Sequence, residues 1–200
     1  FYKSYLNTYL EKDIRMIKNI SSYSSFLKFL KFRKRAFIFD RAGTGKTYQG
    51  IISSLEVGSK KTLVITQKGL KIQWLEHIEY FGKTVSDFQE NFSDLNTDAD
   101  FHIIHFDQLN NNKEKEHKYD FNQFNYDMII VDEAHGVKNL SGVRGAYVRE
   151  LISNENCEYV LGLTATPFET NEQVFQIYSN MGIQANDLIP LSENDTNKKR

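Results

Sequence analysis

Cysteine, proline and long apolar runs are scarce in this 200-residue sequence. Its single cysteine, Cys157, has no partner for an internal disulfide, which favours a reducing, intracellular setting (cytoplasm or nucleus) and leaves a viral or phage origin open. No stretch approaches the ~18 consecutive apolar residues of a membrane-spanning helix, so we expect a soluble protein with no membrane partner. The formal net charge of −1 excludes a strong global attraction to polyanions, and any binding to nucleic acid has to come from local basic patches.

The apolar content is sufficient for a folded core, since 40% of the residues are hydrophobic and 14% are aromatic. Short apolar runs are bounded by polar residues and alternate with segments in which apolar residues have helical spacing. The runs are 62–66 (TLVIT), 101–106 (FHIIHF), 128–131 (MIIV) and 159–163 (YVLGL). Because strands buried on both faces have this near-continuous pattern, we predict an α/β fold with a mainly parallel, doubly wound sheet and helices on both faces.

The N-terminal part of the chain predicts helices. Apolar residues recur at helical spacing over 2–20, and the serine-rich stretch 21–25 can cap a second helix over about 25–32. A basic run follows, made up of Lys31, Arg33, Lys34 and Arg35. This run fits solvated charge at a helix C-terminus, where the dipole favours cations, or contact with a phosphate backbone.

Further helices are expected on either side of the run 62–66. A helix over 47–55 would end at Gly58, and a helix over 70–81 has its apolar residues, among them Trp74, on one face. We therefore expect Trp74 in the core rather than as a stacking platform for a base. Residues 83–100 predict an acidic loop that lacks the spacing and glycine of a calcium-binding loop.

Two histidines and a polar stretch lie in the middle of the chain. His102 and His105 are three residues apart and so face opposite sides of the predicted strand, which argues against a shared metal ion. Residues 110–119 (NNNKEKEHKY) have no apolar periodicity and predict a surface loop.

The stretch 37–47, FIFDRAGTGKT, predicts a buried strand that runs into a phosphate-binding loop. Gly43 and Gly45 allow the backbone to curl close to an anion, because residues without a Cβ accept positive φ and close approach. With Thr44 between them, they would offer backbone N–H groups to phosphates at the N-terminus of the next helix. Asp40 stands where the general pattern has glycine, so a chance Gly-Lys-Thr in a surface turn is the alternative.

A nucleoside triphosphate also requires a cation and a place for Mg²⁺. Lys46 would reach the β- and γ-phosphates, and Thr47 would place its hydroxyl on Mg²⁺. Asp132 and Glu133 directly follow the run 128–131, at the carboxyl end of a predicted parallel strand. We assign Asp132 to the metal ion and Glu133 to the attacking water, the alternative being a strand end with exposed acids.

A third motif, Thr164-Ala165-Thr166-Pro167, follows the run 159–163 and would by itself be an ordinary turn. Taken together, GTGKT, VDEAH and LTATP resemble, in this order, motifs I, II and III of the first RecA-like lobe of superfamily 2 helicase-like ATPases. The details are most similar to the Swi/Snf-type double-stranded-DNA translocases. These details are DRAGTGKTYQ at 40–49, IQW at 72–74, HFDQL at 105–109 and VKN at 137–139.

The resemblance implies a RecA-like ATP-binding lobe over 36–183, preceded by a helical segment over 1–35 and followed by a polar tail or linker over 184–200. It implies ATP and Mg²⁺ as ligands and nucleic acid, with double-stranded DNA favoured, as the partner. Nothing after Gly182 resembles motifs IV to VI, so we expect the second RecA-like lobe, with its arginine finger, in the same or a partner chain.

The resemblance also implies roles for further residues. His135 would act with the catalytic acids. Together with Thr164 and Thr166, it would couple the γ-phosphate to nucleic acid and to the second lobe. Contacts with nucleic acid would come from Lys68, His105 and Lys138.

Three departures keep alternatives open. TATP replaces the TGTP that is usual in the Swi/Snf-type family and also occurs in restriction-enzyme motors. No leucine-arginine-proline-tyrosine-glutamine segment precedes the loop, which leaves adenine recognition unassigned. No stretch of this sequence resembles motifs IV to VI. The alternatives are the motor lobe of a restriction or repair helicase and a scaffold lobe that binds ATP without hydrolysing it.

Overall fold

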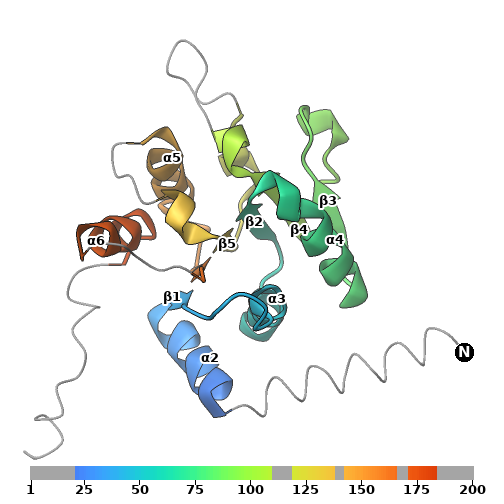
Figure 1. Ribbon diagram of the computed structural model, residues 1–200. Helices are drawn as coiled ribbons and strands as arrows, with labels where there is room; N and C mark the ends of the chain where they lie inside the picture. Colours follow the sequence, from blue (N-terminus) through green and yellow to red (C-terminus); the bar gives the residue numbers. More distant parts are fainter. Residues whose placement is uncertain (1–20, 110–118, 138–141, 166–170, 184–200) are drawn as a thin grey trace, which may run out of the picture.

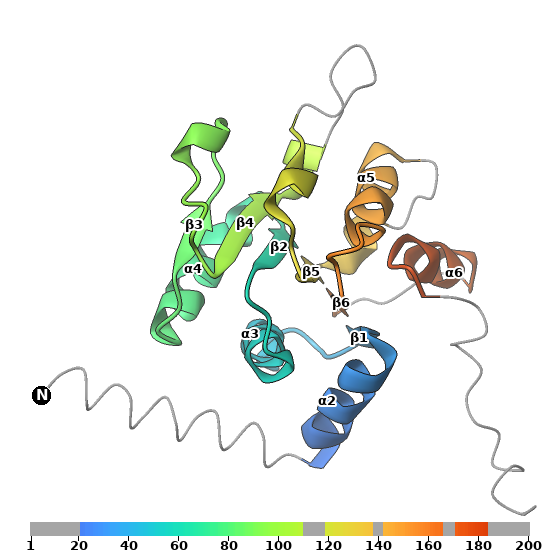
Figure 2. The same cartoon turned by 180° about the vertical axis from the view of Figure 1, so that it is seen from behind.

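The computed structural model describes residues 21–109, 119–137, 142–165 and 171–183. Its strands form one sheet of six parallel strands in the order β1-β6-β5-β2-β4-β3 (Figures 1 and 2). The strands are β1 (Arg35–Ile38), β2 (Thr62–Thr66), β3 (Val85–Asp87), β4 (Phe101–His105), β5 (Met128–Asp132) and β6 (Tyr159–Leu163). The predicted α/β fold with a parallel sheet is confirmed.

Helices cover both faces of this sheet (Figures 1 and 2). One face carries α2 (Ser21–Arg33), α3 (Lys46–Val57) and α4 (Lys71–Tyr80). The other face carries α5 (Val143–Ile152) and α6 (Asn171–Asn180). Short 3₁₀ helices join these elements, namely η1 (Lys68–Leu70), η2 (Phe92–Asp94), η3 (Phe106–Leu109), η4 (Phe121–Phe124) and η5 (Ala134–Val137).

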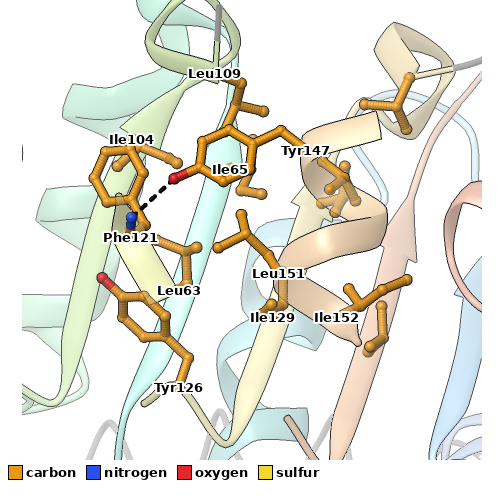
Figure 3. Packing of buried hydrophobic residues seen from close by; sticks show 14 of the residues in the cluster. Leu63, Ile65, Ile104, Leu109, Phe121, Tyr126, Ile129, Tyr147, Leu151 and Ile152 are labelled. Atoms are coloured by element: carbon orange, nitrogen blue, oxygen red, sulfur yellow. Dashed lines mark hydrogen bonds between the residues drawn. The ribbon is translucent and has the colours of Figure 1, made fainter. Parts of the chain in front are cut away.

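The apolar runs of the central strands are continuous because each strand is buried on both faces. Leu63 and Ile65 point toward α5, whereas Val64 between them packs under α3 and α4. Figure 3 shows the α5 side, where Leu63 and Ile65 of β2 lie in one cluster with Tyr147 and Leu151 of the helix. The Tyr147 hydroxyl accepts a 2.8 Å hydrogen bond from the Phe121 N–H, which satisfies a polar group inside the core (Figure 3).

Two details of the helices follow the prediction. Gly58 ends α3 in the left-handed conformation, with φ 76°, and its N–H bonds to the Leu55 carbonyl at 3.2 Å. Trp74 is fully buried between α4 and the sheet.

Several boundaries differ from the prediction, and three of the differences have a clear structural reason. The strand before the loop begins at Arg35 rather than at Phe37, because the pairing with β6 already starts there. Helix α2 includes the serines that were expected to cap it, since Tyr23, between them, packs into the core. Part of the predicted acidic loop, Val85–Asp87, is strand β3 on the outer side of β4. Such a short strand has too few residues for a visible alternation.

His102 is fully buried and has structural partners. Its Nδ1 lies 2.8 Å from the Tyr126 hydroxyl, and its Nε2 lies 3.0 Å from the Asn96 carbonyl. Burial lowers the pKa of His102 to about 4, so the ring is neutral at physiological pH.

Some predictions fall outside the described residues, namely the helix over 2–20, most of the loop over 110–119 and the tail over 184–200. Across the described ranges, none of the helices has the length and apolar character that a bilayer crossing requires.

Candidate nucleotide-binding site

The predicted phosphate loop joins the carboxyl end of β1 to the start of α3. Gly43 and Gly45 have φ values of 79° and 81°, in the left-handed region that residues with a Cβ rarely adopt. A Cβ added at either glycine would meet nothing within 4 Å, so the requirement at these positions is conformational rather than steric. Helix α3 begins at Lys46, and its N-terminus therefore lies directly at the turn.

Hydrogen bonds within the loop hold it in a tight curl. The Lys46 ammonium donates to the carbonyls of Asp40 at 2.9 Å and Arg41 at 3.0 Å. The Thr44 hydroxyl donates to the Arg41 carbonyl at 2.8 Å. Lys46 thus already points to the inside of the turn, where a bound phosphate would offer it oxygens of greater charge.

Asp40, which replaces the first glycine of the general pattern, connects the loop to α3. Its carboxylate accepts a 3.0 Å hydrogen bond from the Gln49 side-chain amide, which also donates to the Thr44 carbonyl at 3.3 Å. Gln49 was not among the predicted site residues. The signal for it was the Tyr48-Gln49 pair, which matches the bulky residue and glutamine that follow this loop in the Swi/Snf-type family.

The two motif acids lie at the carboxyl end of β5. Asp132 is buried, and its Oδ2 accepts hydrogen bonds from the Trp74 indole N–H at 2.8 Å and the Thr66 hydroxyl at 3.0 Å. Its Oδ1 accepts one from the Glu133 backbone N–H at 3.0 Å. Hydrogen bonds to a charged group typically contribute about 1.5–3 kcal/mol each, so this set offsets part of the cost of burying the carboxylate.

Thr66 and Trp74 were missed as functional candidates. A buried tryptophan N–H usually has a polar partner, and that requirement was the one signal available in the sequence.

His135 connects the second motif to the third. Its Nδ1 lies 3.2 Å from Glu133 Oε2 and 3.2 Å from the hydroxyl of Thr164, which is buried just after β6. The structure therefore brings together three predicted site residues from two strand ends. The fourth member of this predicted group, Thr166, lies outside the described residues.

A cleft of about 330 Å³ lies between the loop and the end of β5. Its walls include Gly43, Gly45, Lys46 and Thr47 on one side and Asp132 and Glu133 on the other. A second cleft, of about 400 Å³, also borders Gly45 and is lined mainly by aromatic residues, with one side-chain amide. They include Tyr23, Phe26, Phe39, Tyr48 and Gln49.

The first cleft fits Mg²⁺ in its donor set. A hydroxyl, Thr47, and a carboxylate, Asp132, both line it, and oxygen ligands are those that Mg²⁺ prefers. No three His, Cys, Asp or Glu side chains gather as a metal cage anywhere in the part of the chain that the structure describes. Mg²⁺ commonly keeps waters and is completed by nucleotide phosphates, so a pair of protein ligands is sufficient.

Two of the three residues expected to contact nucleic acid lie near each other. Thr66 and His105 are paired in register at the ends of β2 and β4, and Lys68 follows two residues after Thr66. Lys68 is exposed, whereas His105 is half-buried. The pKa of His105 is lowered mainly by burial and, to a smaller extent, by the positive charge of the nearby Lys71. Lys138 lies outside the described residues.

The order of the motifs along the sheet identifies the class of protein. The phosphate-loop motif follows β1, the acidic motif follows β5, and the Thr-Ala-Thr motif follows the strand between them in space. An all-parallel sheet with these motifs at the carboxyl ends of its strands fits a RecA-like ATPase lobe, because open α/β sheets bind their ligands at that edge.

Comparison with known families agrees with this class. The family described as "Type III restriction enzyme, res subunit" matches residues 8–169, and the chain belongs to this family. A curated relative, the "Uncharacterized ATP-dependent helicase YqhH" of Bacillus subtilis (strain 168), is 28% identical over 151 residues. The match covers 72% of this chain but 26% of the relative, so the chain spans about a quarter of that protein's length.

Two solved structures share the fold. The SWI2/SNF2 ATPase core of Sulfolobus solfataricus, solved in complex with double-stranded DNA, has a TM-score of 0.65 at 20% identity and covers 80% of this chain and 35% of its own. The Hef helicase domain of Pyrococcus furiosus has a TM-score of 0.59 at 17% identity, covering 80% of this chain and 36% of its own. The resemblance to a superfamily 2 helicase-like RecA lobe is therefore confirmed.

Proposed function

We propose that this chain is the ATP-binding lobe of a nucleic-acid-dependent translocase that acts on double-stranded DNA together with a second RecA-like lobe. The observation that carries the proposal is the cleft of about 330 Å³, which Lys46 and Thr47 share with Asp132 and Glu133. These residues come from separate strand ends, and together they have the charges and oxygen donors that Mg²⁺ and a triphosphate require.

Within this cleft the proposed roles are distinct. The backbone of Gly43, Thr44 and Gly45 binds phosphate oxygens, and Lys46 exchanges its loop carbonyls for the β- and γ-phosphates. Thr47 and Asp132 hold Mg²⁺, which supplies charge neutralisation at the phosphates when bound. Glu133 orients the attacking water and accepts its proton.

We propose that the nucleobase enters the second cleft, which adjoins the loop at Gly45. The rings of Tyr48 and Phe39 and the side chain of Gln49 line this cleft and would contact the base. This cleft would replace the upstream recognition segment that the sequence lacks.

His135 and Thr164 support a coupling role. Their 3.2 Å contact joins the acidic motif to the motif after β6, so a change at the γ-phosphate can be transmitted to the segment that includes Thr166. Lys68, His105 and Lys138 are proposed to contact the nucleic-acid backbone, which would make binding independent of sequence and sensitive to salt. The complex of the Sulfolobus relative with double-stranded DNA supports the choice of DNA.

The alternative motor is a restriction or repair helicase, which the family description and the Thr-Ala-Thr-Pro motif favour. Both proposals share this lobe and its chemistry.

We further propose that residues 36–183 form the lobe, with α2 packed on it through Tyr23, Leu27 and Leu30. A scaffold lobe that binds ATP without turnover remains the third alternative.

The substitution Lys46→Ala tests the proposal. It should weaken ATP binding at least tenfold without lowering the melting temperature by more than a few degrees, because a phosphate-loop lysine contributes to the ligand and little to the core. ATP affinity by calorimetry and thermal unfolding by circular dichroism are the measurements. Lys60→Ala, an exposed lysine at the opposite end of the strands, is the matched control. Unchanged ATP affinity in Lys46→Ala would refute the site assignment.

A further inference from the structure

The carboxylate of Asp132 is held by two side chains that lie outside the three motifs. The indole N–H of Trp74, on α4, and the hydroxyl of Thr66, at the end of β2, both donate to Oδ2, at 2.8 and 3.0 Å. Trp74 and Thr66 are both fully buried, and Asp132 is 6% exposed. A carboxylate oxygen that accepts two such bonds from rigid elements has little freedom to rotate.

The helix that follows the phosphate loop is shaped to admit the tryptophan ring. A Cβ added at Gly50 of α3 would lie 3.0 Å from Cη2 of Trp74 and 3.3 Å from Leu163. The missing side chain at Gly50 thus leaves the space in which the indole reaches between α3 and β5 to Asp132. Three separate elements, β2, α3 and α4, consequently determine how this one carboxylate is oriented.

We propose that Trp74 and Thr66 are positioning residues that orient Asp132 toward Mg²⁺, and that this orientation sets the affinity of the site for Mg²⁺ with nucleotide. The proposal rests on the proposed function of the cleft. Groups that hydrogen-bond a metal ligand typically contribute 10- to 100-fold in metal affinity, because they fix its orientation before the metal arrives. Trp74 lies one turn after Lys71, the first residue of α4, and α4 directly follows the short helix η1 that begins at Lys68. The hydrogen bond of Trp74 to Asp132 therefore joins the proposed metal site to the helix next to Lys68.

The experiment compares nucleotide affinity in Mg²⁺ and in EDTA for Thr66→Val, Thr66→Ser and Trp74→Phe. Thr66→Val keeps the shape of the side chain and removes its donor, and Trp74→Phe keeps an aromatic ring and removes the N–H. Both should lose about 10-fold or more of the affinity for Mg²⁺·ATP while the affinity measured in EDTA stays within about twofold. Thr66→Ser, which keeps the hydroxyl, should recover most of the loss.

Thr62→Val is the matched control. It removes a buried hydroxyl from the same strand, but that hydroxyl contacts Ser54 at 2.7 Å and Ser59 at 2.8 Å, at the other end of β2. A merely structural effect of losing a buried hydroxyl would appear in Thr62→Val and Thr66→Val alike, and would not depend on Mg²⁺.

Trp74 is the single tryptophan of the chain and supplies a direct signal. Addition of Mg²⁺·ATP should change its fluorescence more than ATP in EDTA does, and Asp132→Ala should abolish the difference. Mg²⁺-dependent binding by the unmodified chain together with unchanged Mg²⁺ dependence in Thr66→Val and Trp74→Phe would overturn the inference and leave the proposed function intact. Failure of the unmodified chain to bind ATP in either condition would instead refute the proposed function. If Trp74→Phe does not fold, the Thr66→Val and Thr66→Ser pair decides the question.

Discussion

Glu133 has a backbone conformation that is uncommon for a residue with a side chain. Its φ is 51°, and hydrogen bonds hold the conformation on both sides, from its N–H to Asp132 Oδ1 at 3.0 Å and from the Gly136 N–H to its carbonyl at 2.8 Å. Such conformations cost about 1–3 kcal/mol and persist where the surroundings enforce them, often at functional sites. The result here is a carboxylate that turns to His135 while Asp132 keeps its own orientation.

At this residue we predict that Glu133→Gln keeps Mg²⁺·ATP affinity within about twofold but lowers hydrolysis by the intact motor about 10²- to 10⁴-fold, because an amide of equal shape cannot accept a proton. The measurements are equilibrium nucleotide binding and single-turnover hydrolysis in the protein with both lobes.

Asp132→Ala is the comparison for this prediction. It should weaken Mg²⁺-dependent binding itself, since the proposed metal ligand is lost. If both variants had the same phenotype, the division of roles between the two acids would be wrong.

At the scale of elements, the pairing of β1 with β6 depends on one glycine, Gly162, which leaves room for the Phe37 ring. Arg35 to Ile38 pair with Val160 to Leu163, which puts Phe37 opposite Gly162. A Cβ at Gly162 would lie within 2.9 Å of three atoms of the Phe37 ring. That ring also stacks on Phe39 and meets Tyr178 edge-on, with centroid distances of 5.3 and 5.0 Å. The glycine thus allows an aromatic cluster over the strand that leads into the phosphate loop.

We predict that Gly162→Ala destabilises the fold by about 1–3 kcal/mol, because Phe37 has to leave its position or the strands have to shift. Urea unfolding followed by circular dichroism measures the change. Gly69→Ala is the control, since a Cβ there meets nothing within 4 Å, and it should stay within about 0.5 kcal/mol of the unmodified chain. Equal stability of the two variants would contradict the role assigned to the glycine.

At the scale of the whole molecule, each arginine near the motifs either bonds to another side chain of this lobe or belongs to the phosphate loop. Arg144 pairs with Asp107, and Arg149 bonds to Asn180, so both support the packing around α5. Arg41 is an exposed residue of the phosphate loop. An arginine finger contributes roughly 10³- to 10⁵-fold in other nucleotidases, and we propose that in this motor it comes from the second lobe.

We therefore predict that the isolated 200-residue chain binds ATP weakly and hydrolyses it very slowly, with little stimulation by DNA. Its affinity for duplex DNA should be low and should fall as the salt concentration rises, because one lobe alone makes only part of the contacts with the DNA phosphates. Steady-state ATPase assays of this chain and of a protein with both lobes, each with and without duplex DNA, measure the difference. Robust DNA-stimulated turnover by the chain alone would contradict the prediction and would require a finger of its own, for example through self-association.

Much of the fold of this protein follows from the local pattern of apolar and polar residues in its sequence. The apolar runs at 62–66, 128–131 and 159–163 became the predicted strands with their bounds extended by at most one residue. Runs of this kind are typical of strands in the middle of a parallel sheet, and motifs that follow such strands gather at one edge of that sheet. For that reason the superfamily, the fold and the group of candidate site residues were accessible from the sequence, whereas the restriction-enzyme family was present only as an alternative.

What only the tertiary structure decided are the contacts between elements that are distant in the sequence. The order of the strands brings Thr66 and Trp74 to Asp132, 66 and 58 residues further along the chain, and no periodicity encodes such a meeting. Likewise β3 exists because β4 offers it an unpaired edge, not because three residues favour a strand by themselves. Local pattern determines which face of an element is buried, whereas the side chain that each buried polar group meets depends on the register and order in which the elements assemble.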